Sequence, residues 1–378
     1  MADSQTSESA LLVRAEELLP QLRERADEVE AARRLPADLS RLFAEAGFYR
    51  LCVPTDYGGL EASPVSLLRI VERLATVDGS SAWCVFIHAT SGLAALTLPE
   101  TTALRVFSDP LVTLSGVFAP RGRATRAPGG LKVNGRWQWG SGIANAQWVT
   151  AGCLLREAGH DKTQRVGVCV PVSDIQVLDT WHVSGLCGTG STDFALEDKL
   201  VPDSHVQTEL RFTDRPLYRF PFFGLLASPI AAISLGLARG AISTLESFAS
   251  DKTPDGSRRS LANRPTTQVD MAKAEAMVRS ARSYLYESVE AAYNGEGQPS
   301  VNERMHLRLA TTHAVKASAA AVDLMYTLGG GTSVYRSCPL QRSFRDVHVA
   351  TQHMMVSDST LELAGRVLLG QEVDVSLL

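Results

Sequence analysis

The spacing of apolar residues changes twice along this 378-residue chain, and no other feature limits its possible folds as strongly. Residues 8–109 repeat apolar side chains every three or four positions, the period of amphipathic helices. Residues 111–202 carry frequent glycines and short β-prone runs, and helical spacing returns from about residue 222. The order of helices, strands and helices predicts an α+β chain that is mainly α.

These changes predict three domains. We expect a helical N-terminal domain at 1–110, a β-domain at 111–215 and a helical bundle at 216–378, with a linker at 250–264. Short strands separated by turn residues favour a compact β-barrel in the middle domain. Gly129-Gly130 and Asn134-Gly135 are predicted hairpin turns.

Composition excludes some partners and leaves others open. A formal net charge of -4 gives no basic footprint for nucleic acid, so small acidic or neutral partners remain possible. The cysteines form no C-x-x-C motif and no metal-like grouping with histidine, which predicts reduced thiols in a cytoplasmic protein. They stand at positions 52, 84, 153, 169, 187 and 338.

Neither a signal peptide nor a membrane span is expected. The N-terminus is polar and lacks a basic region followed by an apolar one. The most apolar stretch, residues 222–242, is interrupted by Pro229 and Arg239, whereas a span needs about 20 uninterrupted apolar residues. We therefore predict a buried helix there and a cytoplasmic protein.

Several short segments stand out by their order along the chain. They are Leu51-Cys52-Val53-Pro54 with Tyr57-Gly58-Gly59, Val133-Asn134-Gly135-Arg136-Trp137, Gly188-Thr189-Gly190-Ser191-Thr192-Asp193, Gly329-Gly330-Gly331 and Arg345-Asp346. In this order the segments resemble the acyl-CoA dehydrogenase superfamily. The resemblance covers nearly the whole chain and implies a helical N-domain, a central β-barrel and a C-terminal four-helix bundle.

Two departures separate this chain from the dehydrogenase branch. Dehydrogenases typically carry a Glu-Pro-x-Ala-Gly-Ser-Asp loop, where this chain has residues 115–120, and a Tyr-Glu-Gly run, where it has His353 and Met354. With residues 78–83 leading to His88, and 139–142, the chain is similar to the two-component (group D) flavin-dependent monooxygenases. These take reduced FAD or FMN from a separate reductase, form a C4a-hydroperoxyflavin with O2 and hydroxylate an aromatic or heteroaromatic small molecule.

The resemblance assigns catalytic roles to His353 and His88. Imidazole has an unperturbed pKa of about 6.5, so His353 is a candidate to deprotonate a phenol or similar donor. A core histidine in a helical bundle is the alternative for either residue. On a regular helix His348 points about 140° away from His353, so we expect His348 to be structural.

Ser141 is a third candidate, on the end of a predicted strand. The resemblance implies a fixed hydroxyl near flavin N5 that acts as a hydrogen-bond donor and slows loss of peroxide in a pocket that excludes water. Trp139 could stack on the flavin ring beside Gly140. The alternative is a tryptophan-rich strand that packs the barrel.

No G-x-G-x-x-G motif follows a predicted strand, so a Rossmann phosphate site is not supported. The run Gly188-Thr189-Gly190-Ser191 is predicted to be a hairpin. By resemblance, the flavin phosphate would meet a basic loop and a glycine turn of a neighbouring subunit, within a homotetramer. The candidates are Arg258, Arg259 and Arg264 for the loop, and Gly329, Gly330 and Gly331 for the turn.

Three other functions stay open. The same flavin chemistry could N-oxygenate an amine. An acyl-CoA dehydrogenase or oxidase would need a carboxylate base, and the nearest in the C-terminal helix is Glu362, nine residues beyond His353. A catalytically inactive scaffold that binds a partner is the non-enzyme alternative, and the two histidines at the expected places argue against it.

Overall fold

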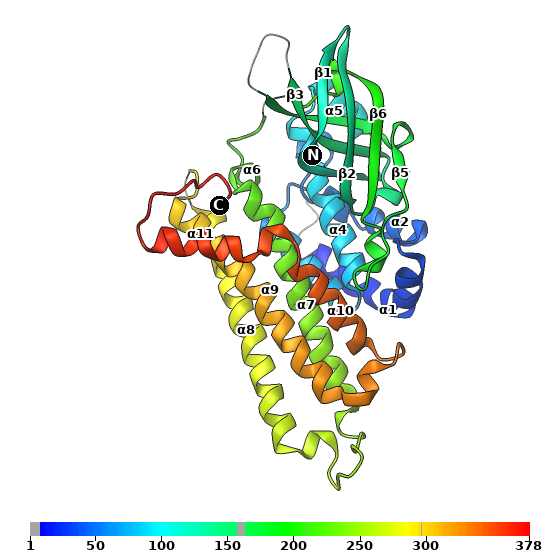
Figure 1. Cartoon of the computed structure of the whole chain (residues 1–378), viewed down its shortest axis with the longest axis vertical. Helices are drawn as coiled ribbons and strands as arrows, with labels where there is room; N and C mark the ends of the chain where they lie inside the picture. The colour runs from blue at the N-terminus through cyan, green and yellow to red at the C-terminus, as the bar shows by residue number, and fades with distance from the viewer. Residues whose placement is uncertain (1–7, 157–162, 209, 296) are drawn as a thin grey trace.

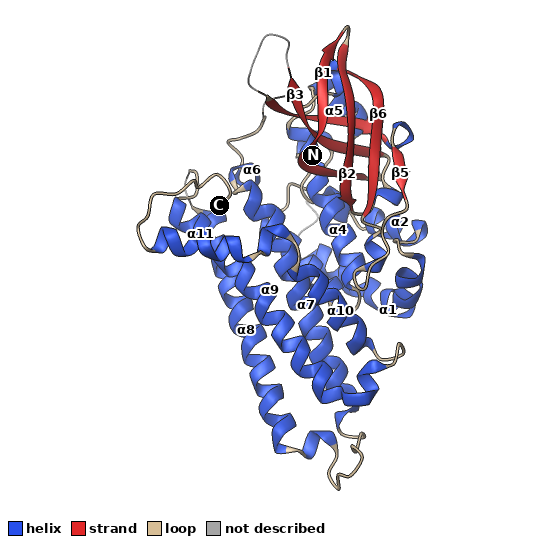
Figure 2. Cartoon of the chain, viewed as in Figure 1, coloured by secondary structure: helices blue, strands red, loops and turns tan. Residues whose placement is uncertain are grey.

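The computed structural model describes residues 8–156, 163–208, 210–295 and 297–378. Helices make up the N-terminal part, as the apolar spacing predicted (Figure 2). Helix starts follow local capping rules: the Asp78 carboxylate accepts the Ser81 N–H at 2.7 Å, where one helix begins. The helices are α1 (Glu8–Ala32), α2 (Ala37–Glu45), α3 (Pro64–Ala75), α4 (Gly79–Ser91) and α5 (Glu100–Val106).

The middle part is a six-stranded sheet in the described residues, in the order β4-β3-β1-β2-β6-β5. Only β1 and β3 pair in parallel, and the other neighbours are antiparallel. The strands are β1 (Leu114–Ala127), β2 (Gly130–Gly140), β3 (Trp148–Arg156), β4 (Gln164–Pro171), β5 (Gln176–Leu178) and β6 (Thr192–Pro202).

The described strands do not confirm the predicted barrel. The sheet is open, because the edge strands β4 and β5 do not pair with each other. β5 is only three residues long and pairs with β6 alone, so no ladder closes the ring. The central strand β1 bends at a register shift between Val117 and Gly122, which curves the sheet without closing it.

Only one of the predicted hairpin turns is confirmed. Gly129, with φ +82°, joins β1 to β2. Asn134 and Gly135 instead lie inside β2, where the Asn134 amide donates to Asp198 of β6 and the register shifts. The run at 188–191 forms no hairpin, because it includes part of a 3-10 turn, η6 (Cys187–Thr189), that packs on α1 and α4.

The C-terminal part is a four-helix bundle, as predicted, and occupies the lower half of Figure 1. A short helix precedes the bundle and another follows it, and the connection at 250–264 lies at its far end. The helices are α6 (Pro216–Arg219), α7 (Phe222–Ala249), α8 (Pro265–Asn294), α9 (Val301–Gly329), α10 (Pro339–Thr351) and α11 (Asp358–Leu368).

Helix α7 is the core of this bundle. It is the one helix in the described residues long and apolar enough to cross a membrane, and 83% of its most apolar window is buried by the rest of the protein. Such burial is typical of a bundle core helix. All six cysteines carry free thiols, as predicted; five are buried and Cys187 is half-buried.

Candidate active site

His353 lies in the turn between α10 and α11, and this turn packs against α7 and α9. Helix α10 ends at Thr351, and His353 is extended, with φ −69° and ψ 131°. The helical-wheel separation of His348 and His353 therefore does not apply, because no regular helix joins them. His348 is nevertheless outside the site, since its Nε2 pairs with Asp323 at 2.8 Å.

The His353 imidazole is neutral at neutral pH. Burial, reinforced by the positive charge of Arg308, lowers its pKa to about 4. Its Nδ1 accepts the Met355 N–H at 3.3 Å, which assigns the ring hydrogen to Nε2. His353 is thus a hydrogen-bond donor through Nε2, and a poorer base than the sequence suggested.

Ser141 sits in a buried chain of hydroxyl groups next to His353. The indole of Trp83, on α4, lies 5.9 Å from the His353 ring and donates its N–H to Ser141 Oγ at 3.2 Å. Ser141 Oγ is 2.6 Å from Ser191 Oγ, which is 2.7 Å from Thr189 Oγ1. We call Thr189, Ser191 and Ser141 the hydroxyl chain.

The direction of every bond in the hydroxyl chain follows from its last member. Thr189 Oγ1 donates its single hydrogen to the carbonyl of Leu186 at 2.8 Å. Ser191 must then donate to Thr189, and Ser141 must donate to Ser191. Ser141 therefore faces any further ligand as an acceptor, which corrects the expectation of a donor at this position.

His88, on α4, lies in the core with 1% of its surface exposed. Its Nδ1 is 2.7 Å from the carbonyl of Leu114, so Nδ1 carries the hydrogen, and burial lowers its pKa to about 4. Its Nε2 is a buried acceptor without a hydrogen-bond partner among the described residues. The ring touches the turn after Ser141, where a Cβ on Gly142 would lie 2.6 Å from Nε2.

Trp139 and Gly140 precede Ser141 at the end of β2. Trp139 has φ +67° and is 61% exposed, so its indole is free to cover a planar ligand. Gly140 has a packing role, because a Cβ there would lie 3.1 Å from both Phe194 and the Thr192 carbonyl. Of the two residues, only Trp139 offers a side chain to a cofactor.

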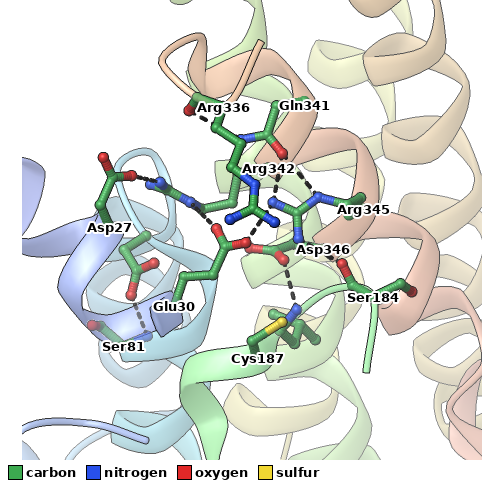
Figure 3. Close-up of polar contacts among 12 residues, drawn as sticks. Asp27, Glu30, Ser81, Ser184, Cys187, Arg336, Gln341, Arg342, Arg345 and Asp346 are labelled. Carbon is green, nitrogen blue, oxygen red and sulfur yellow. Dashed lines mark hydrogen bonds and ion pairs between the residues drawn. The ribbon is translucent and has the colours of Figure 1, made fainter. Parts of the chain in front are cut away.

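The Arg345-Asp346 pair of α10 holds the loop that leads to the hydroxyl chain. Arg345 Nη1 donates to the Ser184 carbonyl at 2.6 Å, and the Asp346 carboxylate accepts the Leu186 N–H at 2.6 Å. Gly185 lies between them, where a Cβ would stand 2.4 Å from the Arg345 carbonyl oxygen. We call these contacts the loop clamp (Figure 3).

Ion pairs between α10 and α1 hold the arginine of the loop clamp in place (Figure 3). Glu30 accepts from Arg342 Nε and from Arg345 Nη2, both at 2.8 Å, and Arg342 also pairs with Asp27. Burial raises the pKa of Asp346 to about 7, the nearby charge of Asp78 adds to the rise, and the Leu186 N–H opposes it. The N-terminal helices, the loop and the bundle meet at this point.

The predicted phosphate-binding residues lie at the other end of the bundle. Arg258 and Arg264 belong to the connection between α7 and α8, the lowest part of the chain in Figure 1. Gly329 and Gly330 end α9 nearby, where the Lys252 ammonium donates to the Gly329 carbonyl. The structure therefore does not bring these residues together with Ser141 and His353 within one chain.

Sequence reasoning missed several residues of the site. Trp83 was noted only as part of a motif, although an indole N–H in a buried helix requires a partner. Ser191 and Thr189 carried no signal, because their role depends on contacts between distant segments. Arg308 carried none either, since one arginine in a long amphipathic helix ordinarily faces solvent.

The chain matches known protein families along most of its length. Residues 9–100 match the family described as acyl-CoA dehydrogenase, N-terminal domain, and residues 228–358 match the C-terminal domain. Indole-3-acetate monooxygenase of Pseudomonas putida is 35% identical, over 94% of this chain and 93% of that protein. The flavin-dependent monooxygenase oxygenase subunit HsaA of Rhodococcus jostii (strain RHA1) is 30% identical, over 90% and 93%.

Solved structures agree. The crystal structure of 3-HSA hydroxylase from Rhodococcus sp. RHA1 has a TM-score of 0.91 at 27% identity, over 99% of this chain and 100% of that chain. XiaF from Streptomyces sp., in complex with FADH2 and glycerol, has a TM-score of 0.90 at 26% identity, over 97% and 96%. These matches define an acyl-CoA dehydrogenase fold. Within it, the chain belongs to the oxygenase components of flavin-dependent monooxygenases, which confirms the resemblance.

The residues present fit a reduced flavin beside an aromatic substrate. Ser141 offers an acceptor, His88 Nε2 is an unpaired buried acceptor and His353 offers a donor. Exposed aromatic side chains suit planar ligands: Trp139 is 61% exposed, and Phe118 is 59% exposed with its ring 4.9 Å from that of Phe222.

Proposed function

We propose that this chain hydroxylates an aromatic or heteroaromatic small molecule, using O2 and reduced FAD supplied by a separate reductase. The observation that carries the proposal is a neutral histidine donor, His353, next to Trp83 and the hydroxyl chain, at the place where dehydrogenases carry a carboxylate base. The names of the relatives support an aromatic substrate, and the FADH2 bound to XiaF supports FAD over FMN.

The bound reduced flavin would supply the electrons that activate O2. The protein residues would bind and orient the flavin and the substrate, and would exclude water from the site. Ser141 and Trp139 would hold the flavin ring, while His353 Nε2–H and His88 Nε2 would orient a polar group of the substrate. Because both imidazoles are neutral at pH 7, they orient by hydrogen bonding and not by charge.

The arrangement of the chain supports a homotetramer in which each flavin meets two subunits. Arg258 and Arg264 have no carboxylate at ion-pair distance within the described part of the chain, so both are free to bind the flavin phosphates of a neighbouring copy. Gly330 has φ +54° and no atom within 4 Å of an added Cβ, so the glycine turn leaves room for those phosphates. A cytoplasmic location agrees with the six free thiols.

The experiment combines the purified chain with an unrelated flavin reductase, NADH, FAD and ¹⁸O2, and offers indole-3-acetate and simple phenols. We expect one ¹⁸O atom in the product by mass spectrometry. Peroxide release measures the uncoupled reaction. His353→Ala should lose most product, whereas His348→Ala, at a surface pair with Asp323, should keep it.

A contrary result would be oxidised FAD that stays tightly bound through purification and is bleached by an acyl-CoA. That behaviour belongs to a dehydrogenase or oxidase, which needs a carboxylate at the site. Glu362, the candidate base, is exposed on α11, so the structure offers no support for this alternative.

A further inference from the structure

Arg308 of α9 is a buried cation without an anion. It is 5% exposed, and its Nε and Nη1 have no hydrogen-bond partner in the part of the chain that the structure describes. Its Nη2 has one long contact, 3.5 Å to the hydroxyl of Thr360 on α11. No carboxylate of the described residues lies at ion-pair distance from its guanidinium group.

Such an arrangement is costly unless something completes it. Burial lowers the pKa of Arg308 only to about 10, so the side chain stays charged at neutral pH. A buried charge with unsatisfied donors is strongly unfavourable, and proteins normally offset this cost with a paired anion. Guanidinium offers a planar pair of donors that matches a carboxylate.

The position of Arg308 connects it to the candidate active site. Its charge acts on the His353 imidazole, and α9 packs against the turn that carries His353. The acidic side chains on either side of Thr360 in sequence do not pair with it: Asp358 pairs with Lys316, and Glu362 is exposed. The missing anion must therefore come from outside the described chain.

We propose that Arg308 binds the carboxylate of the substrate, and that this enzyme acts on an aromatic acid in which a short arm separates ring and carboxylate. The ring would then lie toward His353 and Trp83, and the acid group toward Thr360. The proposal rests on the proposed function, and it names a substrate class and the residue that selects it. Arg308 is a substrate-binding residue in this scheme, with no part in proton transfer.

Binding is the first test, measured by calorimetry on the full-length enzyme without turnover. The probes are indole-3-acetate and its neutral amide, indole-3-acetamide. Wild type should bind the acid about tenfold or more tightly than the amide, since a charged hydrogen bond is worth about 1.5–3 kcal/mol. Arg308→Gln should abolish this difference, and Arg308→Lys should restore part of it. Arg279→Gln, which removes an exposed charge from α8, should leave it unchanged.

The second test measures thermal stability. It distinguishes a loss of substrate binding from a loss of folding in the Arg308 variants. Arg308→Met replaces an unpaired buried charge by an apolar chain of similar length, so the ligand-free variant should melt at the same or a higher temperature. Indole-3-acetate should raise the melting temperature of wild type but not of this variant. A lower melting temperature in the ligand-free variant would show that Arg308 already pairs within the assembly, which overturns the proposal.

Other outcomes also overturn it. If Arg308→Gln weakens acid and amide equally, Arg308 is not the carboxylate ligand. If it weakens reduced FAD and leaves indole-3-acetate unchanged, the missing anion is the flavin. Because these measurements require no hydroxylation, they stay informative if the ¹⁸O2 experiment fails, and a hydroxylating enzyme with no preference for acids would refute this inference alone.

Discussion

At the scale of single residues, the two histidines present opposite hydrogen-bonding groups. His88 donates Nδ1–H to the Leu114 carbonyl and keeps Nε2 as an acceptor, whereas His353 accepts at Nδ1 and keeps Nε2–H as a donor. Each tautomer is set by a backbone group next to the ring. The two neutral rings can therefore orient a polar group of the substrate that has both a donor and an acceptor.

Both imidazoles should remain neutral well below their usual titration range. Their pKa values of about 4 lie below the value in the unfolded chain, so both rings stay neutral as the pH falls from 8 to 5. The free energy of unfolding therefore decreases as the pH falls from about 6.5 to about 4, because only the unfolded chain takes up these protons. Histidine ¹⁵N NMR, assigned with His88→Gln and His353→Gln, should show no protonation of either above pH 5. Titration of His353 near pH 6.5 would contradict this account.

The hydroxyl chain should make the enzyme prefer reduced flavin. Reduced flavin carries an N–H at N5 and oxidised flavin a lone pair, and Ser141 is held as an acceptor by Ser191. Ser191→Ala frees the Ser141 hydrogen, so the ratio of the two affinities should fall about tenfold. Anaerobic and aerobic fluorescence titrations measure it. Ser234→Ala, a buried hydroxyl bonded to its own helix, is the control and should leave the ratio unchanged.

Asp346 should make stability depend on pH near neutrality. Its pKa of about 7 lies above the unfolded value, so its contribution to the free energy of unfolding is present below about pH 4 and is lost as the pH rises to about 7. Asp346→Asn can still accept from Leu186 and removes this loss. In urea unfolding, the free energy of unfolding of the variant should rise relative to that of wild type between pH 5 and pH 8. A constant difference would contradict the assignment.

At the scale of elements, the loop clamp joins α10 to the loop before β6, and Gly185 sets how closely they approach. Because the atoms that meet an added Cβ belong to the backbone of Arg345, neither element can yield without moving the other. The position of Ser191, and through it of Ser141, therefore depends on the seating of α10 against this loop.

Gly185→Ala should destabilise the protein by about 1–3 kcal/mol, the usual cost of overpacking. It should also raise peroxide release relative to product, because the hydroxyl chain shifts with the loop. Urea unfolding and the coupling ratio measure the two effects. Gly365→Ala on α11, where nothing lies within 4 Å of an added Cβ, should raise stability by about 0.5–1 kcal/mol. Equal behaviour of the two variants would refute the clamp.

At the scale of the whole molecule, the proposed flavin site is divided between the two ends of the bundle. Figure 1 shows the connection between α7 and α8 far below the turn between α10 and α11. A single chain cannot bring Arg264 to a flavin at its own Ser141, so the proposed phosphate contact would require a second copy.

Mixed assemblies test this division. A chain with His353→Ala and a chain with Arg258→Glu and Arg264→Glu should each be inactive alone. Co-expressed, they should recover about one quarter of wild-type activity, because random pairing makes one site in four intact. Native mass spectrometry confirms mixing. Mixed tetramers without activity would show that each subunit builds its own site.

The sequence by itself determined the order of helices and strands, the four-helix bundle and the family, because periodicity and local motifs are written in neighbouring residues. It also singled out His353, His88 and Ser141. It could not determine the open sheet, the tautomers or the direction in which Ser141 donates, because these depend on Thr189, Asp346 and backbone carbonyls far away in the chain. Only the packing of distant segments decided which buried polar groups are satisfied, and which, like Arg308, still lack a partner.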